Sequence, residues 1–405
     1  MPTIARKNSA TQPAATKARF DLLTTIVFFL LLSLPLASQW WAGASNISES
    51  ENRLLARPPT LETNWESWAS FPQRSEAYLD DHLGLRETMI RNFTRIHLAA
   101  FGISPSKMLV VGEEGWFFVG DRDAVAHYRG IDPLGPGELK RWQRVLEERQ
   151  AWLAEQGIAY LVVLVPDKHE VYGEYMPASL PRTSEIRPLG QLADQLAEHS
   201  NIPFLDLREA LAQEKDKRRI YHQTDTHWND AGAYAAYVAI LGQLDETLPN
   251  LEASQPVRVR RTRHDSAGLG LAALVGMEEI LREEVLSVEV ARPHSQIAPE
   301  HRAGYARRTR QLLPLAHGVP DPDLPRAVMF RDSFGTALIP FLSEHFSRIL
   351  YVWERDVDPH VVRIEKPDIV IQEIVGRFLG RRPQGVGERI ERARLRPKDE
   401  AKELN

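Results

Sequence analysis

The segment Tyr221-His222-Gln223-Thr224-Asp225-Thr226-His227-Trp228-Asn229-Asp230-Ala231-Gly232 decides how the rest of the chain is interpreted. The apolar periodicity of residues 231–244 predicts a helix, which Asn229 or Asp230 can cap. One residue separates Asp225 from His227, so their side chains point the same way only if the backbone is extended. We therefore expect a strand or tight loop that displays a carboxylate and an imidazole where a helix begins.

Two interpretations of the Asp225–His227 pair are open. A carboxylate beside a histidine stabilises the imidazolium and fixes its tautomer, which suits a general base with its orienting group. In the other interpretation, Asp225 accepts hydrogen bonds from the backbone at the helix start and His227 only packs. Because an Asp-x-His string is short and common, this segment alone does not choose between them.

The composition places the chain among ordinary globular proteins. Of its 405 residues, 43% are hydrophobic and 26% are charged, so the chain can bury a sizeable core in one large or two medium domains. The net charge of -5 does not indicate nucleic-acid binding. No cysteine is present, which excludes disulfides, thiolate metal sites and a cysteine nucleophile, and suits an exported protein.

The N-terminus predicts a membrane anchor. Basic residues without any acid precede Asp21, and an apolar run follows up to Trp40-Trp41. The span 20–41 is about long enough to cross a bilayer, and the leading positive charges place the N-terminus in the cytoplasm. A signal peptide cleaved near Ala42-Gly43-Ala44 is the alternative, and in either case the body of the protein is exported.

From Gly137 onward, helical segments alternate with short apolar runs. Strands are expected at 158–165, 202–207, 327–330, 348–353 and 368–375, and helices at 138–156, 189–199, 229–244, 334–345 and 357–364. A hairpin is expected at 108–119, while no topology is drawn for 250–325. The pattern predicts an α/β fold with a mainly parallel sheet covered by helices on both faces. Active residues of such sheets lie beyond the carboxyl ends of strands, here in loops 166–175, 222–229 and 331–336.

The third of these loops supplies a candidate nucleophile. In Phe330-Arg331-Asp332-Ser333-Phe334 a buried strand turns into a helix with Ser333 at the bend. A serine there exposes its hydroxyl, and its own amide at the helix start could stabilise an oxyanion. Alternatively, Asp332 or Ser333 is only a helix cap. With His227 as base and Asp225 as orienting residue, Ser333 would complete a catalytic triad.

The order of these motifs resembles that of the alginate O-acetyltransferase AlgJ/AlgX family, with its SGNH-hydrolase-like domain. The resemblance covers about residues 50–380 and rests on Asp225-Thr226-His227-Trp228 before Asp332-Ser333-Phe334, the reverse of ordinary SGNH esterases. It also includes three further motifs: Asp80-Asp81-His82-Leu83-Gly84-Leu85-Arg86, Gly115-Trp116-Phe117-Phe118, and Val165-Pro166-Asp167-Lys168 with Tyr172 and Pro177.

The sequence pattern and the resemblance together imply the organisation and location of the chain. We expect a disordered cytoplasmic tail (1–19), a transmembrane anchor (20–41), a linker (42–70), the SGNH-like domain (71–380) and a solvated charged tail (381–405). A carbohydrate-binding module of one family branch has no room after residue 380, which indicates the anchored branch. The protein would be a single-pass inner-membrane protein with its body in the periplasm, or a soluble periplasmic protein after signal cleavage.

Two departures from the family pattern concern residues near the candidate serine. Arg331 replaces the usual glycine before Asp-Ser, which would strain the backbone if that position needed a positive φ. Arg331 could instead face a polyanionic sugar, or simply be solvated. Gly376 stands where an acidic residue is expected near Arg377.

Other residues are candidates for substrate binding or for structural roles. Lys168 and Tyr172 could bind substrate, as could Arg377, while Asn229 resembles a loop-shaping residue of SGNH enzymes and could equally be a cap. Gly232 would be a packing glycine and His222 structural. His82 and His169 have no ligand-like partners nearby, so no metal and no cofactor are expected.

The sequence thus predicts an O-acetyltransferase working through an acyl-Ser333 intermediate. Its acceptor would be a hydroxyl group of an exported exopolysaccharide such as alginate, and a membrane protein of the same acetylation complex would supply the acyl group. Two alternatives stay open: a non-catalytic polysaccharide-binding or scaffold subunit of that complex, and a plain SGNH carbohydrate esterase.

Overall fold

The computed structural model describes residues 14–38, 47–48, 53–248, 255–298 and 314–395. Internal contacts divide the chain into two units. The first comprises Met1–Phe101 with Leu274–Met277, and the second comprises Gly102–Ala273 with Glu278–Asn405. The expected single domain from residue 71 to 380 is therefore divided at residue 101, and each unit is described by itself.

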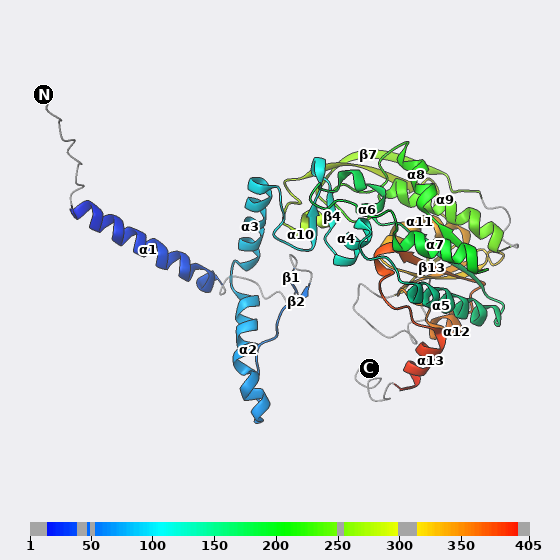
Figure 1. Cartoon of the computed structure of the whole chain (residues 1–405), viewed down its shortest axis with the longest axis horizontal. Coiled ribbons are helices and arrows are strands. Elements are labelled where there is room, and N and C mark those ends of the chain that lie inside the picture. Colours follow the sequence, from blue (N-terminus) through cyan, green and yellow to red (C-terminus); the bar gives the residue numbers. More distant parts are fainter. Residues whose placement is uncertain (1–13, 39–46, 49–52, 249–254, 299–313, 396–405) are drawn as a thin grey trace. The chain divides into compact units, whose positions relative to one another are not determined.

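The first unit contains the expected apolar helix. Helix α1 runs from Ala14 to Ser38, and its stretch Ala18–Pro35 is long and apolar enough to cross a membrane (Figure 1). Such a helix near the N-terminus is compatible with a membrane anchor or a signal sequence. Because α1 begins at Ala14, the end of the predicted disordered tail is helical. Residues 1–13, Trp40-Trp41 and the possible cleavage site at 42–44 lie outside the described residues.

Two further helices follow in the first unit. Asn64 caps the first of them, because its side chain accepts a hydrogen bond of 2.7 Å from the Ser67 amide. This helix begins at Trp65, so the last part of the expected linker, which ends at residue 70, is helical. Leu85, between these two helices, has a φ of 63°. The elements are β1 (Ile47–Ser48), β2 (Arg53–Leu54), α2 (Trp65–His82) and α3 (Arg86–Phe101).

A seven-stranded sheet of order β6-β5-β13-β11-β12-β10-β9 forms the centre of the second unit. The five strands from β6 to β12 are parallel, and β10 and β9 extend the sheet antiparallel. The predicted α/β fold with a mainly parallel sheet is confirmed. The strands are β5 (Ala159–Val165), β6 (Phe204–Asp206), β9 (Gln296–Ile297), β10 (Leu315–Gly318), β11 (Arg326–Arg331), β12 (Arg348–Trp353) and β13 (Ile369–Val375).

Apolar side chains alternate between two cores, one on each face of the sheet. On β5, Leu161 and Val163 pack into the core that includes helix α9 (Asp230–Thr247), while Val162 and Leu164 face the other core. Helices α5 (Pro136–Ala154) and α7 (Pro188–His199) cover that second face. Strands buried on both faces read as continuous apolar runs, which is why the sequence located them.

The remaining elements of the second unit surround the sheet. Two antiparallel ribbons accompany it, the predicted hairpin β3–β4 and the ribbon β7–β8 in the region left without topology. The bounds are β3 (Leu109–Val111), η1 (Glu113–Gly115), β4 (Phe117–Val119), α4 (Arg122–Arg129), α6 (Lys168–Val171), η2 (Gly173–Tyr175), α8 (Arg208–Lys215), β7 (Val259–Ala267), α10 (Gly270–Leu274), β8 (Arg282–Val290), η5 (Phe334–Leu338), α11 (Ile339–Leu342), η6 (Ser343–His345), α12 (Pro359–Glu365), η7 (Gly376–Phe378) and α13 (Val386–Leu395).

Two expected elements differ from the structure. The predicted helix 334–345 is three short pieces, η5, α11 and η6, because the backbone tightens to 3-10 geometry on either side of α11. The chain after residue 380 is not wholly a solvated tail. Val386 is buried, Arg389 pairs with Glu354 at 3.4 Å, and the Gly387 amide donates to Glu148 at 2.9 Å. Residues 396–405 lie outside the described part.

Helix α9 offers a matched test of the packing beneath the 222–229 loop. A Cβ on Gly232 would collide with the Ile220 carbonyl oxygen and lie 3.0 Å from the Trp228 Cβ. Gly232→Ala should therefore lower the free energy of unfolding by about 1–3 kcal/mol. Gly242 in the same helix has open space around it, so Gly242→Ala should be neutral or stabilise by up to about 1 kcal/mol. Urea unfolding measures both, and equal effects would contradict the close approach.

Candidate active site

Four loops meet at the carboxyl edge of the parallel strands. Lys168, after β5, donates to the Asp225 carbonyl at 2.9 Å, and the Trp228 indole donates to the Phe334 carbonyl at 3.1 Å. Arg377, after β13, pairs with Asp167, after β5. The three loops singled out in the sequence therefore lie together, and the turn after β13 joins them.

The Asp225–His227 pair forms by a different backbone path from the one expected. Residues 223–227 are bends rather than extended strand, closed by an isolated bridge between Tyr221 and Trp228. Asp225 Oδ1 accepts from the His227 amide at 2.9 Å and from His227 Nδ1 at 2.6 Å. The aspartate thus folds its own loop back and orients the imidazole in the same contact.

The environment keeps Asp225 ionised. Its Oδ2 accepts from the Gly270 amide at 2.8 Å. Burial alone would raise the pKa of Asp225, but the hydrogen bonds and charge of His227 outweigh burial and hold that pKa well below its usual range. Because Nδ1 of His227 donates to this carboxylate, Nε2 of the neutral ring can accept a proton.

His227 Nε2 and the Ser333 hydroxyl are both left uncommitted. His227 Nε2 is buried and has no hydrogen-bond partner among the described residues. The His227 ring centroid lies 4.9 Å from that of Phe334, the residue that follows Ser333. Ser333 makes no side-chain capping bond at η5, whereas Asp332 Oδ1 accepts from the Phe334 amide at 2.8 Å. Asp332 is therefore the capping residue, and no bond yet joins Ser333 to His227 in the described part of the chain.

A buried glutamate holds the turn that contains Ser333. Glu373 of β13 accepts from the Asp332 amide at 3.3 Å and also from the Gly335 amide. Burial, followed by the charge of Asp332, raises the pKa of Glu373 well above its ordinary value. Since the Asp332 and Phe334 amides bond carboxyl oxygens, the Ser333 amide is the one at this turn left for another acceptor.

Arg331 is neither strained nor solvated. It lies in β11, does not have a positive φ, and is 3% exposed. Its Nη1 donates to the Asp332 carbonyl and to Thr336 Oγ1, both at 2.8 Å, and its guanidinium stacks on Trp353. This burial argues against direct contact of Arg331 with substrate and for a role in shaping the turn.

Lys168 and Tyr172 are also buried. Lys168 Nζ donates to the carbonyls of Phe117 at 2.6 Å and of Gln223 at 2.9 Å, besides that of Asp225. Burial lowers the pKa of Lys168 to about 7, against the opposing effects of Glu283 and Asp225. The Tyr172 hydroxyl accepts from the Ile220 amide at 3.0 Å. These internal partners argue for positioning roles rather than for direct contact with substrate.

Asn229 and Arg377 have internal partners as well. Asn229 caps α9, accepting from the Ala231 and Gly232 amides at 3.0 and 3.1 Å, and it donates to the Arg219 carbonyl at 2.9 Å. The cap interpretation of Asn229 is confirmed. Arg377 pairs with buried Asp167, and its guanidinium lies 5.1 Å from the Phe334 ring.

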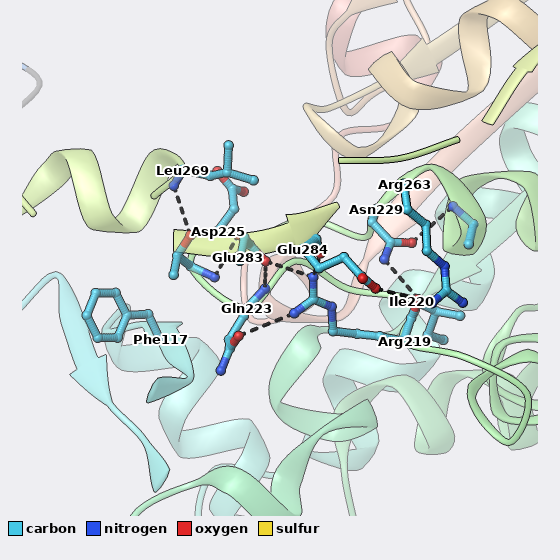
Figure 2. A network of polar contacts seen from close by, with 12 residues as sticks. Phe117, Arg219, Ile220, Gln223, Asp225, Asn229, Arg263, Leu269, Glu283 and Glu284 are labelled. Carbon is cyan, nitrogen blue, oxygen red and sulfur yellow. Dashed lines mark hydrogen bonds and ion pairs between the residues drawn. The ribbon is translucent and has the colours of Figure 1, made fainter. Parts of the chain in front are cut away.

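Glu283 is a site residue that the sequence did not reveal. Glu283, on β8, accepts from the Gln223 amide at 2.7 Å and from Thr224 Oγ1 at 2.7 Å, and pairs with Arg219 at 3.2 Å (Figure 2). Lys168 holds the carbonyls of loop 223–225, while Glu283 holds its amides. We call these two residues the loop clamp. The sequence did not reveal Glu283 because it lies on the ribbon β7–β8, whose polar sequence resembles that of a surface loop.

A metal site requires several acidic or histidine side chains close together. Within the described residues, no group of three or more His, Asp or Glu side chains is placed to hold a metal ion. The chemistry that the arrangement can perform is proton transfer and nucleophilic attack by Ser333.

A parallel sheet with an Asp-His loop and a serine turn at its carboxyl edge defines the SGNH-hydrolase-like class. Residues 109–304 match the family described as "SGNH hydrolase-like domain, acetyltransferase AlgX". This match, together with the similarity to AlgJ, supports the resemblance to the AlgJ/AlgX family. The matched span contains Asp225 and His227 and ends before Ser333.

The individual relatives share low sequence identity with this chain. The "Probable alginate O-acetylase AlgJ" of Pseudomonas aeruginosa is 27% identical over 139 residues, and the match spans 34% of this chain and 34% of that relative. Bacillus cereus PatB1 with a sulfonyl adduct superposes with a TM-score of 0.50 at 14% identity, over 67% of this chain and 95% of that one. The O-acetyltransferase domain of Pseudomonas putida AlgJ gives 0.43 at 16% identity, over 73% and 97%. The likeness to PatB1 concerns the fold.

The loop clamp predicts unequal effects of two neighbouring glutamates. Glu283→Gln turns one acceptor into a donor that faces the loop amides, and should lower the free energy of unfolding by about 1–3 kcal/mol. Lys168→Met removes three donors and should cost about 2–4 kcal/mol. Exposed Glu284, which pairs with Arg263 at 3.5 Å, is the control, and Glu284→Gln should change stability by less than about 0.5 kcal/mol. If urea unfolding gives equal values for both glutamine variants, the clamp is wrong.

The depressed pKa of Asp225 predicts how stability depends on pH. A carboxyl whose folded pKa lies below its unfolded value contributes stability above about pH 4, and loses it as the pH falls. At neutral pH the free energy of unfolding of the wild-type protein should exceed that of Asp225→Asn by about 1–3 kcal/mol. This difference should shrink below about pH 4. Unfolding in a series of buffers measures this, with Asp265→Asn at an exposed ion pair as control. A difference that stays constant across pH would mean that Asp225 is not ionised preferentially in the folded state.

Proposed function

We propose that this protein is an O-acetyltransferase that acts through an acyl-Ser333 intermediate on an exported exopolysaccharide such as alginate. One observation carries the proposal. His227 is oriented by Asp225 through a 2.6 Å contact, and its other nitrogen is buried, without a described partner, beside the turn that presents Ser333. The similarity of residues 109–304 to the acetyltransferase AlgX family supports acetyl transfer as the reaction.

In the first half-reaction, Ser333 Oγ attacks the acyl carbonyl of the donor while His227 Nε2 takes the hydroxyl proton. Asp225 stabilises the resulting imidazolium. The oxyanion would be bound by the Ser333 amide, because the amides of Asp332 and Phe334 already bond carboxyl oxygens. The donor group leaves with the proton returned by His227, and acetyl-Ser333 remains.

In the second half-reaction, a sugar hydroxyl attacks the acetyl-Ser333 carbonyl. His227 accepts the proton of that hydroxyl and returns it to Ser333 Oγ as the ester bond to serine breaks. The acetylated sugar leaves, and the serine is restored. Transfer requires that a sugar hydroxyl reaches the ester before water does.

We further propose the cellular setting. Helix α1 would anchor the chain in the inner membrane, with the second unit in the periplasm. The acyl donor would then be a membrane protein of the same acetylation complex, since acetyl groups must cross from the cytoplasm. A carbohydrate esterase would differ only in releasing acetate to water.

Removal of the proposed triad residues should abolish turnover without unfolding the protein. Ser333→Ala and His227→Ala should each lower the rate on a chromogenic acetate by about a thousandfold or more, and Asp225→Asn by roughly a hundred- to ten-thousandfold. Exposed His264 supplies the matched control, and His264→Gln should keep wild-type activity.

Circular dichroism would verify that each variant is folded. Substantial activity in folded Ser333→Ala would remove the triad. A wild-type protein that binds polysaccharide but releases no acetate and transfers none would instead favour the scaffold alternative. Comparing acetyl transfer to an oligosaccharide with release to water separates the transferase from the esterase.

A further inference from the structure

Two arginines lie against one aromatic ring at the carboxyl edge of the sheet. The guanidinium carbons of Arg355 and Arg381 are 4.5 and 4.9 Å from the ring centroid of Phe378. Both arginines are exposed, and neither forms an ion pair with any carboxylate of the described chain. Burial, followed by the charge of Arg381, lowers the pKa of Arg355. Two exposed like charges are thus held around one ring at the surface.

Neighbouring acids do not balance this charge. The acids that face Arg355 are Asp332, Asp356 and Glu354. Asp356 pairs with buried Arg149, and Glu354 pairs with Arg389 at 3.4 Å. Asp332 is buried and already accepts from the Phe334 amide. An anion from outside the chain would complete the pair.

The two arginines are connected to the candidate active site by direct contacts. The Arg377 guanidinium lies 5.1 Å from the Phe378 ring and 5.1 Å from the ring of Phe334, which follows Ser333. Arg377 itself is neutralised by Asp167. A chain of ring contacts therefore links the two exposed arginines to the turn that contains Ser333.

An exposed indole lies on the same edge. Trp353 is the last residue of β12 and is 36% exposed, while the rest of that strand is buried. The Arg331 guanidinium lies 4.7 Å from its ring and also bonds Thr336 in the serine turn. An aromatic face of this kind suits the apolar C–H face of a sugar ring.

We propose that Arg355, Arg381 and Trp353 form a subsite for an acidic sugar unit of the acceptor polymer. The two arginines bind the sugar carboxylate, and Trp353 stacks on the ring of the sugar. The proposal rests on the proposed function, because it assigns where the acceptor of that reaction is bound.

Binding can be measured apart from catalysis in the full chain carrying Ser333→Ala. The probes are a uronic acid oligosaccharide and the same oligosaccharide with its carboxyl groups reduced to alcohols, titrated by calorimetry. The acidic probe should bind at least about tenfold more tightly and lose that advantage as salt is added.

Single substitutions then separate charge from stacking. Arg355→Gln and Arg381→Gln should each lower the affinity for the acidic probe about three- to tenfold and leave the affinity for the neutral probe unchanged. Trp353→Ala should weaken both probes by a similar factor. The control is Arg144→Gln, an equal charge change at an exposed position of α5, which should affect neither probe.

The subsite is overturned if the two arginine variants bind the acidic probe like the parent, if Trp353→Ala leaves both probes unchanged, or if neither probe binds. That failure is distinguishable from failure of the proposed function. Wild-type turnover of a chromogenic acetate, lost in Ser333→Ala, would preserve the proposed chemistry while the subsite is rejected.

Discussion

The site depends on how a short loop without regular structure is held in place. Loop 223–225 has no strand or helix to fix it, yet it must present Asp225 and His227 accurately. Lys168 bonds two of its carbonyls and Glu283 bonds its amides, and both side chains are buried. Two carbonyls and two amides of the loop therefore have charged partners, and the Thr224 carbonyl accepts from the Leu271 and Ala272 amides, which avoids the cost of unsatisfied buried polar groups. The ribbon β7–β8 is the element that brings Glu283 to this position.

The buried polar groups around the site have separate roles. Asp225 both folds its loop and orients the imidazole, Asp332 caps η5, and Glu373 holds the amides around the serine turn. These contacts leave His227 Nε2 and the Ser333 hydroxyl without a described partner, and buried Arg331 Nε and Glu373 Oε1 beside the serine turn are also unpaired. Unpaired polar groups gathered at one edge are candidates for chemistry, and among these the imidazole and the hydroxyl suit proton transfer and nucleophilic attack. The residues first considered for substrate contact, among them Lys168 and Arg331, instead support this frame.

The sequence predicted the parallel strands and their edge because buried strands leave continuous apolar runs. It also predicted the loops that contain Asp225, His227 and Ser333, because each follows a strand or precedes a capped helix. Four features could not be predicted from the sequence, for physical reasons. The backbone at 223–227 is bent because Asp225 bonds the amide two residues on, an alternative that side-chain alternation cannot show. Glu283 lies on a ribbon whose exposed face is mostly charged. Segment 334–345 and the chain after 380 take their form from tertiary contacts rather than from local pattern.

The most direct test of the account is to find the acyl group on the protein. The full chain would be mixed with an activated acetyl ester, quenched within the first turnover, digested and analysed by mass spectrometry. The account predicts one acetyl group on Ser333, formed by wild-type protein and not by His227→Ala. An acetyl group on another residue, or turnover without any acetylated serine, would contradict it.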